Sequence, residues 1–262
     1  MLVRDDGLVI GQPAHAWVAG QLARAWGNDA FPAPAPREPF CLAAEQHDVG
    51  WSDADLAPTP GPDGRPLSFA QQPRTAHLAI WRGAAERLLA QSRYAALLVS
   101  LHGTSLYERV DADAEAPGDA SAIREYLAGE RALQAALGVG LDPVEVDRNR
   151  RLLLALDRLS LMLCLGRATR LADVPGARCA SEIRCEPTDE GVPTAAARDD
   201  HAVPRTTPTA RYTLDPWPFG APAVAVGCEA RQLGGSFASA ADLRAALATA
   251  PWVPLRWELI PC

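Results

Sequence analysis

The amino-acid sequence predicts a mainly α-helical protein with a small β-containing subdomain at its C-terminal end. Apolar residues recur at spacings of three and four through most of residues 12–166, which is the pattern of helices that bury one face. Beyond residue 167 the pattern changes, and short runs typical of strands follow. We therefore expect a helical domain at residues 1–166 and a small α+β appendage at residues 167–262.

The helical half begins with a short strand whose apolar part reads LVI, and a helix follows from Gln12. The tripeptide GND ends that helix, and a second helix with the text FCLAAEQHDVGW ends near Gly50. Residues 52–75 read as a long loop with five prolines. Because loops of this length in compact domains are often functional, we expect it near the active site. Four further helices are expected at about residues 76–91, 94–107, 120–137 and 143–166.

The C-terminal part starts with a polar segment, residues 186–210, that is rich in Pro, Thr and Asp. This composition predicts a flexible loop. Three strands are expected after it, with the texts ARYTLDPWPF, AVAVGCEARQL and VPLRWELIP. Between the last two strands we expect a short helix with the text ADLRAAL, which the hydroxyl of Ser239 can cap.

The charge balance excludes several classes of protein. The net charge of −7 argues against broad nucleic-acid binding, which requires clustered positive charge. All 25 basic residues are arginine, so chemistry that depends on a P-loop lysine or a Schiff-base lysine is excluded. The absence of lysine and the abundance of Ala, Pro and Gly are typical of proteins from GC-rich bacterial genomes.

The chain is expected to work in a reducing cytoplasm. Its six cysteines contain no CxxC pair, and the start MLVRDDGLVI turns acidic before an apolar stretch develops, unlike a signal peptide. No run of about 18 apolar residues is present, so we expect no membrane partner. Nothing in the sequence sets an oligomeric state.

The helical half also carries a set of residues that suit a metal centre. Four of the five histidines lie there, and an aspartate directly follows His47. Asp157 stands in the most apolar helix, where a carboxylate is costly to bury without a partner such as a metal ion. Imidazole and carboxylate together suit Fe, Mn, Zn or Co. Taken singly, a helical histidine is more often a core or surface residue, Asp157 can pair with Arg158, and His201 is expected to face solvent.

The order of these residues resembles the HD superfamily of metal-dependent phosphohydrolases. The text LAAEQHDVGW is similar to the superfamily's helix ending in His-Asp, and LLLALDRLS is similar to its last metal-aspartate helix. The resemblance covers about residues 12–166 and implies an HD-like helical bundle. It implies a first metal held by His15, His47, Asp48 and Asp157. It also implies a second metal with His77 and His102, with Asp48 able to bridge the two.

The whole chain resembles, in addition, a family of uncharacterised bacterial proteins that carries a domain of unknown function. The shared text includes QPAHAWVAGQLARAWG, EQHDVGW, GRPLSF, LLVSLHGTSLY, LDRLSL and DPWPF. This second resemblance implies no activity.

Three further residues are candidates for roles beside the metal. Glu45 lies just before His-Asp, where the HD helix is usually aliphatic. It can carry a proton for catalysis, or it can be a surface residue. Gln12, one turn before His15, can orient that ring or a bound water, or can simply be a polar residue at a helix start. Arg65, in GRPLSF, is the candidate for contacting an anionic substrate, since guanidinium groups match phosphate oxygens.

The function that follows is hydrolysis of a phosphate ester or phosphodiester, including one in a nucleotide. The cofactor is one or two divalent ions of Fe, Mn, Zn or Co, and the partner is a small anionic molecule. Two other classes stay open. HD-like scaffolds with two irons also activate dioxygen, which makes a di-iron oxygenase the alternative. The remaining class is a non-catalytic binding module with a structural metal.

Overall fold

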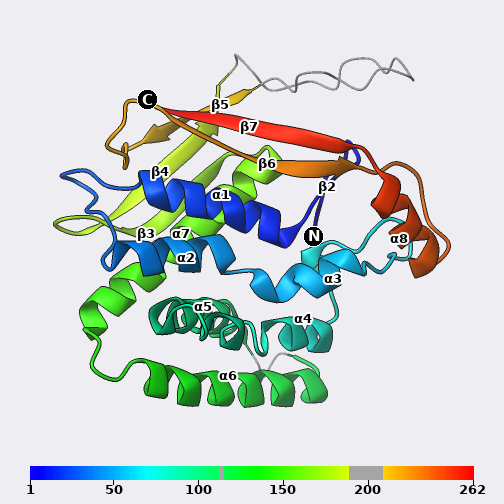
Figure 1. Ribbon diagram of the computed structural model, residues 1–262, viewed down its shortest axis with the longest axis horizontal. Coiled ribbons are helices and arrows are strands. Elements are labelled where there is room, and N and C mark those ends of the chain that lie inside the picture. Colours follow the sequence, from blue (N-terminus) through cyan, green and yellow to red (C-terminus); the bar gives the residue numbers. More distant parts are fainter. Residues whose placement is uncertain (112–114, 189–208) are drawn as a thin grey trace.

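The computed structural model describes residues 1–111, 115–188 and 209–262, and its fold is mixed α/β (Figure 1). A seven-stranded sheet with the order β1-β2-β6-β7-β5-β4-β3 lies over a stack of helices. The prediction of a mainly α, HD-like bundle with a small C-terminal β subdomain is therefore wrong. The sheet contains strands from both ends of the chain, so the strands do not form a separate C-terminal subdomain.

The strands pair antiparallel except for β5 and β7, which are parallel. The N-terminal hairpin joins the sheet through β2, where Leu8 lies opposite Gln232 of β6. Along β7 buried and exposed residues alternate, as in a sheet with one covered face. The strands are β1 (Leu2–Val3), β2 (Leu8–Ile10), β3 (Thr169–Pro175), β4 (Ala180–Pro187), β5 (Ala210–Asp215), β6 (Val224–Gln232) and β7 (Trp252–Pro261).

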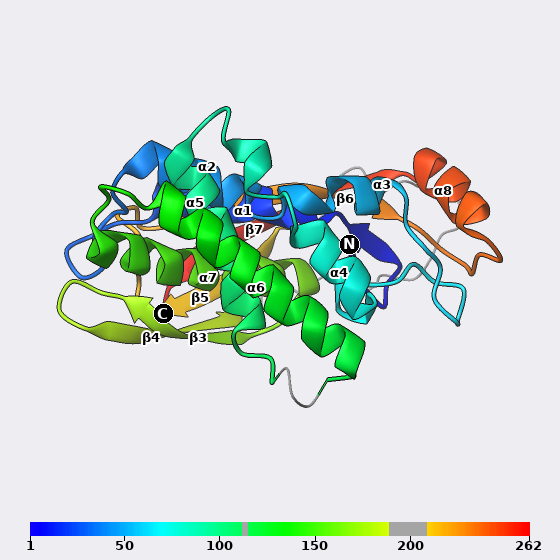
Figure 2. The ribbon, with the colours of Figure 1, turned by 90° about the horizontal axis from the view of Figure 1, so that it is seen from below.

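The helices form successive layers beneath this sheet (Figures 1 and 2). Helix α1 packs on β6 and α7 packs on β3, while α2 and α5 lie below them and α6 covers the side farthest from the sheet. The α-helices are α1 (Gln12–Ala25), α2 (Arg37–Gln46), α3 (Ser52–Leu56), α4 (Arg74–Trp81), α5 (Arg93–Tyr107), α6 (Pro117–Leu137), α7 (Pro143–Leu165) and α8 (Ala240–Thr249). Three single turns of 3-10 helix are η1 (Val49–Trp51), η2 (Phe69–Gln71) and η3 (Glu86–Leu88).

One side chain of α1 fixes this helix to the sheet. Gln21 donates from Nε2 to the carbonyl of Gly227 at 2.8 Å and accepts from the Gly227 N–H at 3.0 Å. The amide therefore satisfies both backbone groups of a residue in β6, much as a neighbouring strand would. A β-carbon at Gly227 would lie 2.6 Å from the carbonyl oxygen of Leu255, so the close pairing of β6 and β7 requires glycine at this position.

The ends of the long helices follow from local sequence. The Asp142 side chain accepts from the N–H of Val144 and caps α7, and Gly166 ends this helix in the left-handed conformation at φ 68°. Ser239 caps α8 by accepting from the N–H of Asp242, which confirms the predicted cap.

The predicted loop at residues 52–75 contains α3 and η2, and two predicted helices end earlier than expected. Residues 76–91 were expected to form one helix, but α4 ends at Trp81 and Gly83 adopts a φ of 77°, which a continuous helix does not allow. The second helix ends at Gln46 rather than near Gly50, so His47 lies at its C-terminal end.

The sequence interpretation also missed β3 and β4. Their burial patterns alternate, but β4 exposes charged residues on one face and has a short apolar signal. The predicted loop at 186–210 lies mostly outside the described residues, and the described part of this range belongs largely to the ends of β4 and β5.

No helix among the described residues is long and apolar enough to cross a membrane. All six cysteines, each within the described ranges, are free thiols.

The pairing of N-terminal and C-terminal strands in one sheet predicts cooperative unfolding of the chain. Because β2 pairs with β6 and α1 packs on the same strand, we expect residues of both chain halves to unfold in one cooperative transition. Replacing the buried Leu259 of β7 by alanine should lower the free energy of unfolding by about 2–5 kcal/mol. Denaturation followed by circular dichroism and by tryptophan fluorescence measures both effects.

The matched control is Leu56→Ala, because Leu56 is 77% exposed and its loss should change stability by less than about 0.5 kcal/mol. Two separate transitions would instead support the division at residue 166 that the sequence pattern predicts, which so far stays a prediction.

Candidate metal centre

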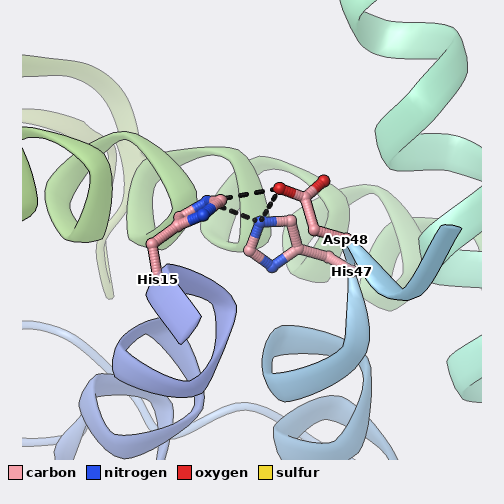
Figure 3. Close-up of side chains that lie close together, drawn as sticks. All are labelled: His15, His47 and Asp48. Carbon is pink, nitrogen blue, oxygen red and sulfur yellow. Dashed lines mark hydrogen bonds and ion pairs between the residues drawn. The ribbon is translucent and has the colours of Figure 1, made fainter. Parts of the chain in front are cut away.

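Five histidine and aspartate side chains from four helical segments meet in the interior. His15 comes from α1, His47 and Asp48 from the end of α2, His102 from α5 and Asp157 from α7. All five are buried, and His15 and His47 are completely inaccessible. Figure 3 shows His15, His47 and Asp48 turned toward one another. The four side chains expected to hold the first metal, His15, His47, Asp48 and Asp157, therefore do converge, although 142 positions separate His15 from Asp157.

The facing atoms of this cluster are closely and evenly spaced. His15 Nε2 lies 3.1 Å from Asp157 Oδ1 and 3.5 Å from Asp48 Oδ2. His47 Nε2 lies 3.3 Å from Asp157 Oδ1 and 3.9 Å from Asp48 Oδ2. The two Nε2 atoms are 3.3 Å apart. Four ligand-type atoms thus form a compact group with similar separations.

Four of these separations, 3.1–3.5 Å, fit the edges of a metal coordination shell, and the fifth, between His47 Nε2 and Asp48 Oδ2, is longer at 3.9 Å. Bonds of about 2.1 Å place neighbouring ligands about 3.0 Å apart in an octahedral site and about 3.4 Å apart in a tetrahedral one. Two buried groups could hold a metal ion, His15 with His47 and Asp48, and His47 with His102 and Asp157. Within each group the candidate ligand atoms lie within 4.8 Å of one another.

The end of α2 sets the orientation of His47. Its Nδ1 donates to the carbonyl of Ala44 at 2.8 Å, which fixes a proton on Nδ1 and directs Nε2 at the cluster. Gly50 then permits close packing, because a β-carbon there would lie 2.3 Å from the carbonyl oxygen of Ile80 in α4. The sequence His-Asp-Val-Gly therefore orients a ligand pair and brings α4 against it.

Burial and mutual contacts shift the pKa values of the cluster. Burial lowers the pKa of His47, but Asp48 and Asp157 outweigh it and raise that pKa to about 9. Burial raises the pKa of Asp48, although His47 and His15 oppose this effect. Burial alone would raise the pKa of Asp157. Its hydrogen bonds with His15 and His47 outweigh that effect and hold this pKa well below the ordinary range. Asp157 is therefore the carboxylate that stays charged.

The two histidines predicted for a second metal lie in different surroundings. His102 Nε2 approaches Asp157 Oδ2 at 3.8 Å, its ring contacts His47, and burial lowers its pKa to about 3. His77 belongs to neither group of candidate ligands within the described part of the chain. It forms a very short hydrogen bond through Nδ1 with the hydroxyl of Tyr107.

A pocket of about 280 Å³ borders the cluster, and Asp48, His102 and Asp157 line it. The long loop predicted near the active site does reach it, since Phe69 contributes to the lining. Arg74 adds a guanidinium to the wall. The pocket therefore combines the candidate ligands, a cation and apolar surface.

The three other predicted site residues lie as follows. Gln12 is buried and lines the pocket, and its Oε1 has no hydrogen-bond partner among the described residues. Glu45 forms a short ion pair with Arg24 on the outer side of α2 and does not line the pocket. Arg65 donates from Nη2 to the Arg4 carbonyl at 2.8 Å, also away from the pocket.

Residues missed by the sequence interpretation include Arg74 and Tyr107. Arg74 lies one turn before His77 in α4, so the spacing R-x-x-H was a signal that both side chains share a helix face. Tyr107 ends α5 one turn and a half after His102, and nothing in its local sequence indicates a contact with His77. His201 lies outside the described residues.

The fold and the cluster define a class: a mixed α/β protein whose buried histidines and aspartates could hold a metal ion. The chain belongs to the family DUF3891, described as a protein of unknown function, whose family model matches residues 1–234. Searches of curated proteins and of solved structures found no match. The whole-chain resemblance to an uncharacterised family is thereby confirmed, whereas none of these comparisons supports the link to the HD superfamily.

The cluster predicts the effect of removing one charge. Asp157→Asn keeps the shape of the side chain but removes the carboxylate that contacts His15 and His47. We expect a loss of metal affinity of at least about ten-fold, with the helices still folded through their leucine faces. Elemental analysis beside thermal unfolding measures both properties, and Glu45→Gln is the control that should retain metal. Full metal content in Asp157→Asn would mean that Asp157 is not a ligand.

The raised pKa of His47 predicts proton release on metal binding. Below pH 9 this ring carries a proton on each nitrogen in the metal-free protein. An ion that binds Nε2 must displace the Nε2 proton. Affinity should therefore rise with pH, by up to about ten-fold per unit between pH 6 and 8. Titration calorimetry in buffers of different ionisation enthalpy counts the protons. A binding heat that is independent of the buffer at pH 7 would contradict a charged His47.

Proposed function

We propose that the protein is a metal-dependent phosphohydrolase that acts on a small phosphate ester or phosphodiester. The observation that carries the proposal is the juxtaposition of the evenly spaced ligand cluster with a pocket that contains Arg74. A divalent cation next to a guanidinium favours an anionic substrate, because both attract negative charge that develops on phosphoryl oxygens.

The ligand set supports one ion held by His15, His47, Asp48 and Asp157. Two imidazoles and two carboxylates suit Zn, Mn, Fe or Co. The second group of candidate ligands shares His47 with the first. Because Nδ1 of His47 is already bonded to Ala44, this ring has a single free lone pair, and it can serve only one ion at a time. A second ion would require a rearrangement around His102.

The chain's own groups can assist the chemistry. A bound divalent cation supplies positive charge that polarises a phosphoryl oxygen and acidifies a nearby water. Asp48 lines the pocket, and its Oδ1 points away from the two histidines (Figure 3). Because Oδ2 is the atom that faces the histidines, Oδ1 of Asp48 is free to accept a proton from an attacking water. The apolar part of the pocket near Leu106 and Leu161 can hold the organic group of the substrate.

The ligand order adds support from the sequence, since it resembles that of HD phosphohydrolases. That resemblance now concerns the residues of the site alone, because the overall architecture differs from the predicted bundle. Arg74 replaces Arg65 as the candidate contact for the substrate anion, because it is the one of the two that lines the pocket.

The test is hydrolysis of generic substrates by protein of known metal content. Metal-free protein should gain activity toward p-nitrophenyl phosphate or bis-p-nitrophenyl phosphate when Mn, Zn, Co or Fe(II) is restored. Asp48→Asn should lower kcat by at least about 100-fold, because it removes both a ligand and a proton acceptor. Arg74→Gln should mainly raise KM, and Arg82→Gln, a change at an exposed arginine just after α4, is the matched control.

Each contrary outcome identifies another class. Oxygen uptake by the iron-loaded protein without any phosphatase activity would favour the oxygenase. Metal loss that lowers the unfolding temperature by many degrees, with no activity under either assay, would favour a structural metal in a binding module.

A further inference from the structure

Four side chains lie in succession beside the pocket. His77 Nδ1 makes a very short hydrogen bond with the Tyr107 hydroxyl, and the Arg74 guanidinium lies over the Tyr107 ring, 5.9 Å from its centroid. Arg74 also donates from Nη2 to Glu115 Oε1 at 2.8 Å. The order is therefore His77, Tyr107, Arg74 and Glu115, and both His77 and Arg74 line the pocket.

The proton count on Tyr107 sets the direction of its bond to His77. A tyrosine hydroxyl carries one proton that it can donate, and the Tyr107 side chain is buried away from water. The hydroxyl proton of this buried tyrosine then needs an acceptor, and His77 Nδ1 is the acceptor at hydrogen-bond distance among the described residues. If Nδ1 carried a proton of its own, the hydroxyl proton would be left without a partner at a cost of about 1–3 kcal/mol. Tyr107 is therefore the donor.

His77 is a neutral ring with its one proton on Nε2. Burial and the neighbouring charge of Arg74 lower its pKa to about 4, so at pH 7 it carries a single N–H. Since Nδ1 accepts from Tyr107, that N–H is at Nε2. The rings of Trp51 and Trp81 pack around the imidazole at 5.2 and 6.2 Å between centroids and limit its rotation.

We propose that His77 presents its Nε2–H to an oxygen of the anion bound in the pocket, and that Tyr107 positions it for this role. The ring would then contact substrate as a neutral hydrogen-bond donor rather than hold a second metal ion, for which Nε2 would need a free lone pair. The identity of the anion as a phosphoryl group rests on the proposed function. The assignment of the proton rests on the hydrogen bond between the buried Tyr107 hydroxyl and His77.

Histidine ring nitrogen shifts test the proton assignment directly. In protein labelled with ¹⁵N-histidine at pH 7, His77 should show an unprotonated Nδ1 and a protonated Nε2, its signals being identified by their loss in His77→Gln. Tyr107→Phe should redistribute the proton between the two nitrogens. Tyr126→Phe is the matched control, because Tyr126 packs on the ring of Tyr107 without bonding to His77. A protonated Nδ1 in the wild type would overturn the proposal.

Binding of inorganic phosphate to the metal-loaded protein tests the role of the donor. His77→Gln should retain the wild-type metal content and bind phosphate about ten-fold more weakly or worse, as expected for loss of a hydrogen bond to a charged group. Loss of metal in this variant, or unchanged phosphate binding, would overturn the proposal. If no phosphate ester is hydrolysed while phosphate binding still depends on His77, the proposed function fails and the role of His77 stands.

Discussion

The buried carboxylate of Asp157 is the group on which the arrangement of the helical layers depends. It lies on α7 between leucines and contacts His15 of α1 and His47 at the end of α2, with His102 of α5 close by. A charged carboxylate cannot be removed from water without such partners. The three surrounding helices therefore present imidazoles to one point, and these contacts add to the apolar packing that positions the helices along α7.

The sheet completes this arrangement because α1 lies between it and the cluster (Figure 1). Gln21 forms two hydrogen bonds with Gly227 of β6 on the side of α1 that faces the sheet. His15 projects from the same helix into the cluster. The chain ends meet in the sheet through β2 and β6. The position of one metal-type ligand thus depends on strands that lie more than 200 residues apart in the sequence.

Local patterns predicted most of the helices, because helix periodicity is visible in short stretches, and the resemblance of the ligand order to HD proteins predicted the convergence of His15, His47, Asp48 and Asp157. Asp157 in LLLALDRLS and the His47-Asp48 pair carry this resemblance. The sheet was not predictable in the same way, since the pairing of Leu8 with Gln232 depends on long-range contacts that no local pattern contains. Arg65 was chosen by residue type alone, whereas Arg74 reaches the pocket because Gly50 lets α4 pack closely against the His-Asp turn.

His47 and His77 differ in which ring nitrogen is free to act, and the group bonded to Nδ1 of each ring explains the difference. The Ala44 carbonyl accepts from Nδ1 of His47 and directs a lone pair inward, where carboxylates raise the pKa and a cation can replace the proton. The Tyr107 hydroxyl donates to Nδ1 of His77, while burial and Arg74 keep the ring neutral, so an N–H faces the pocket. An acceptor bonded to Nδ1 makes a ligand of one imidazole, and a donor bonded to Nδ1 makes a hydrogen-bond donor of the other. The same residue type is thus suited to hold a cation in the cluster and to donate a hydrogen bond in the adjoining pocket, which His77 lines and His47 does not.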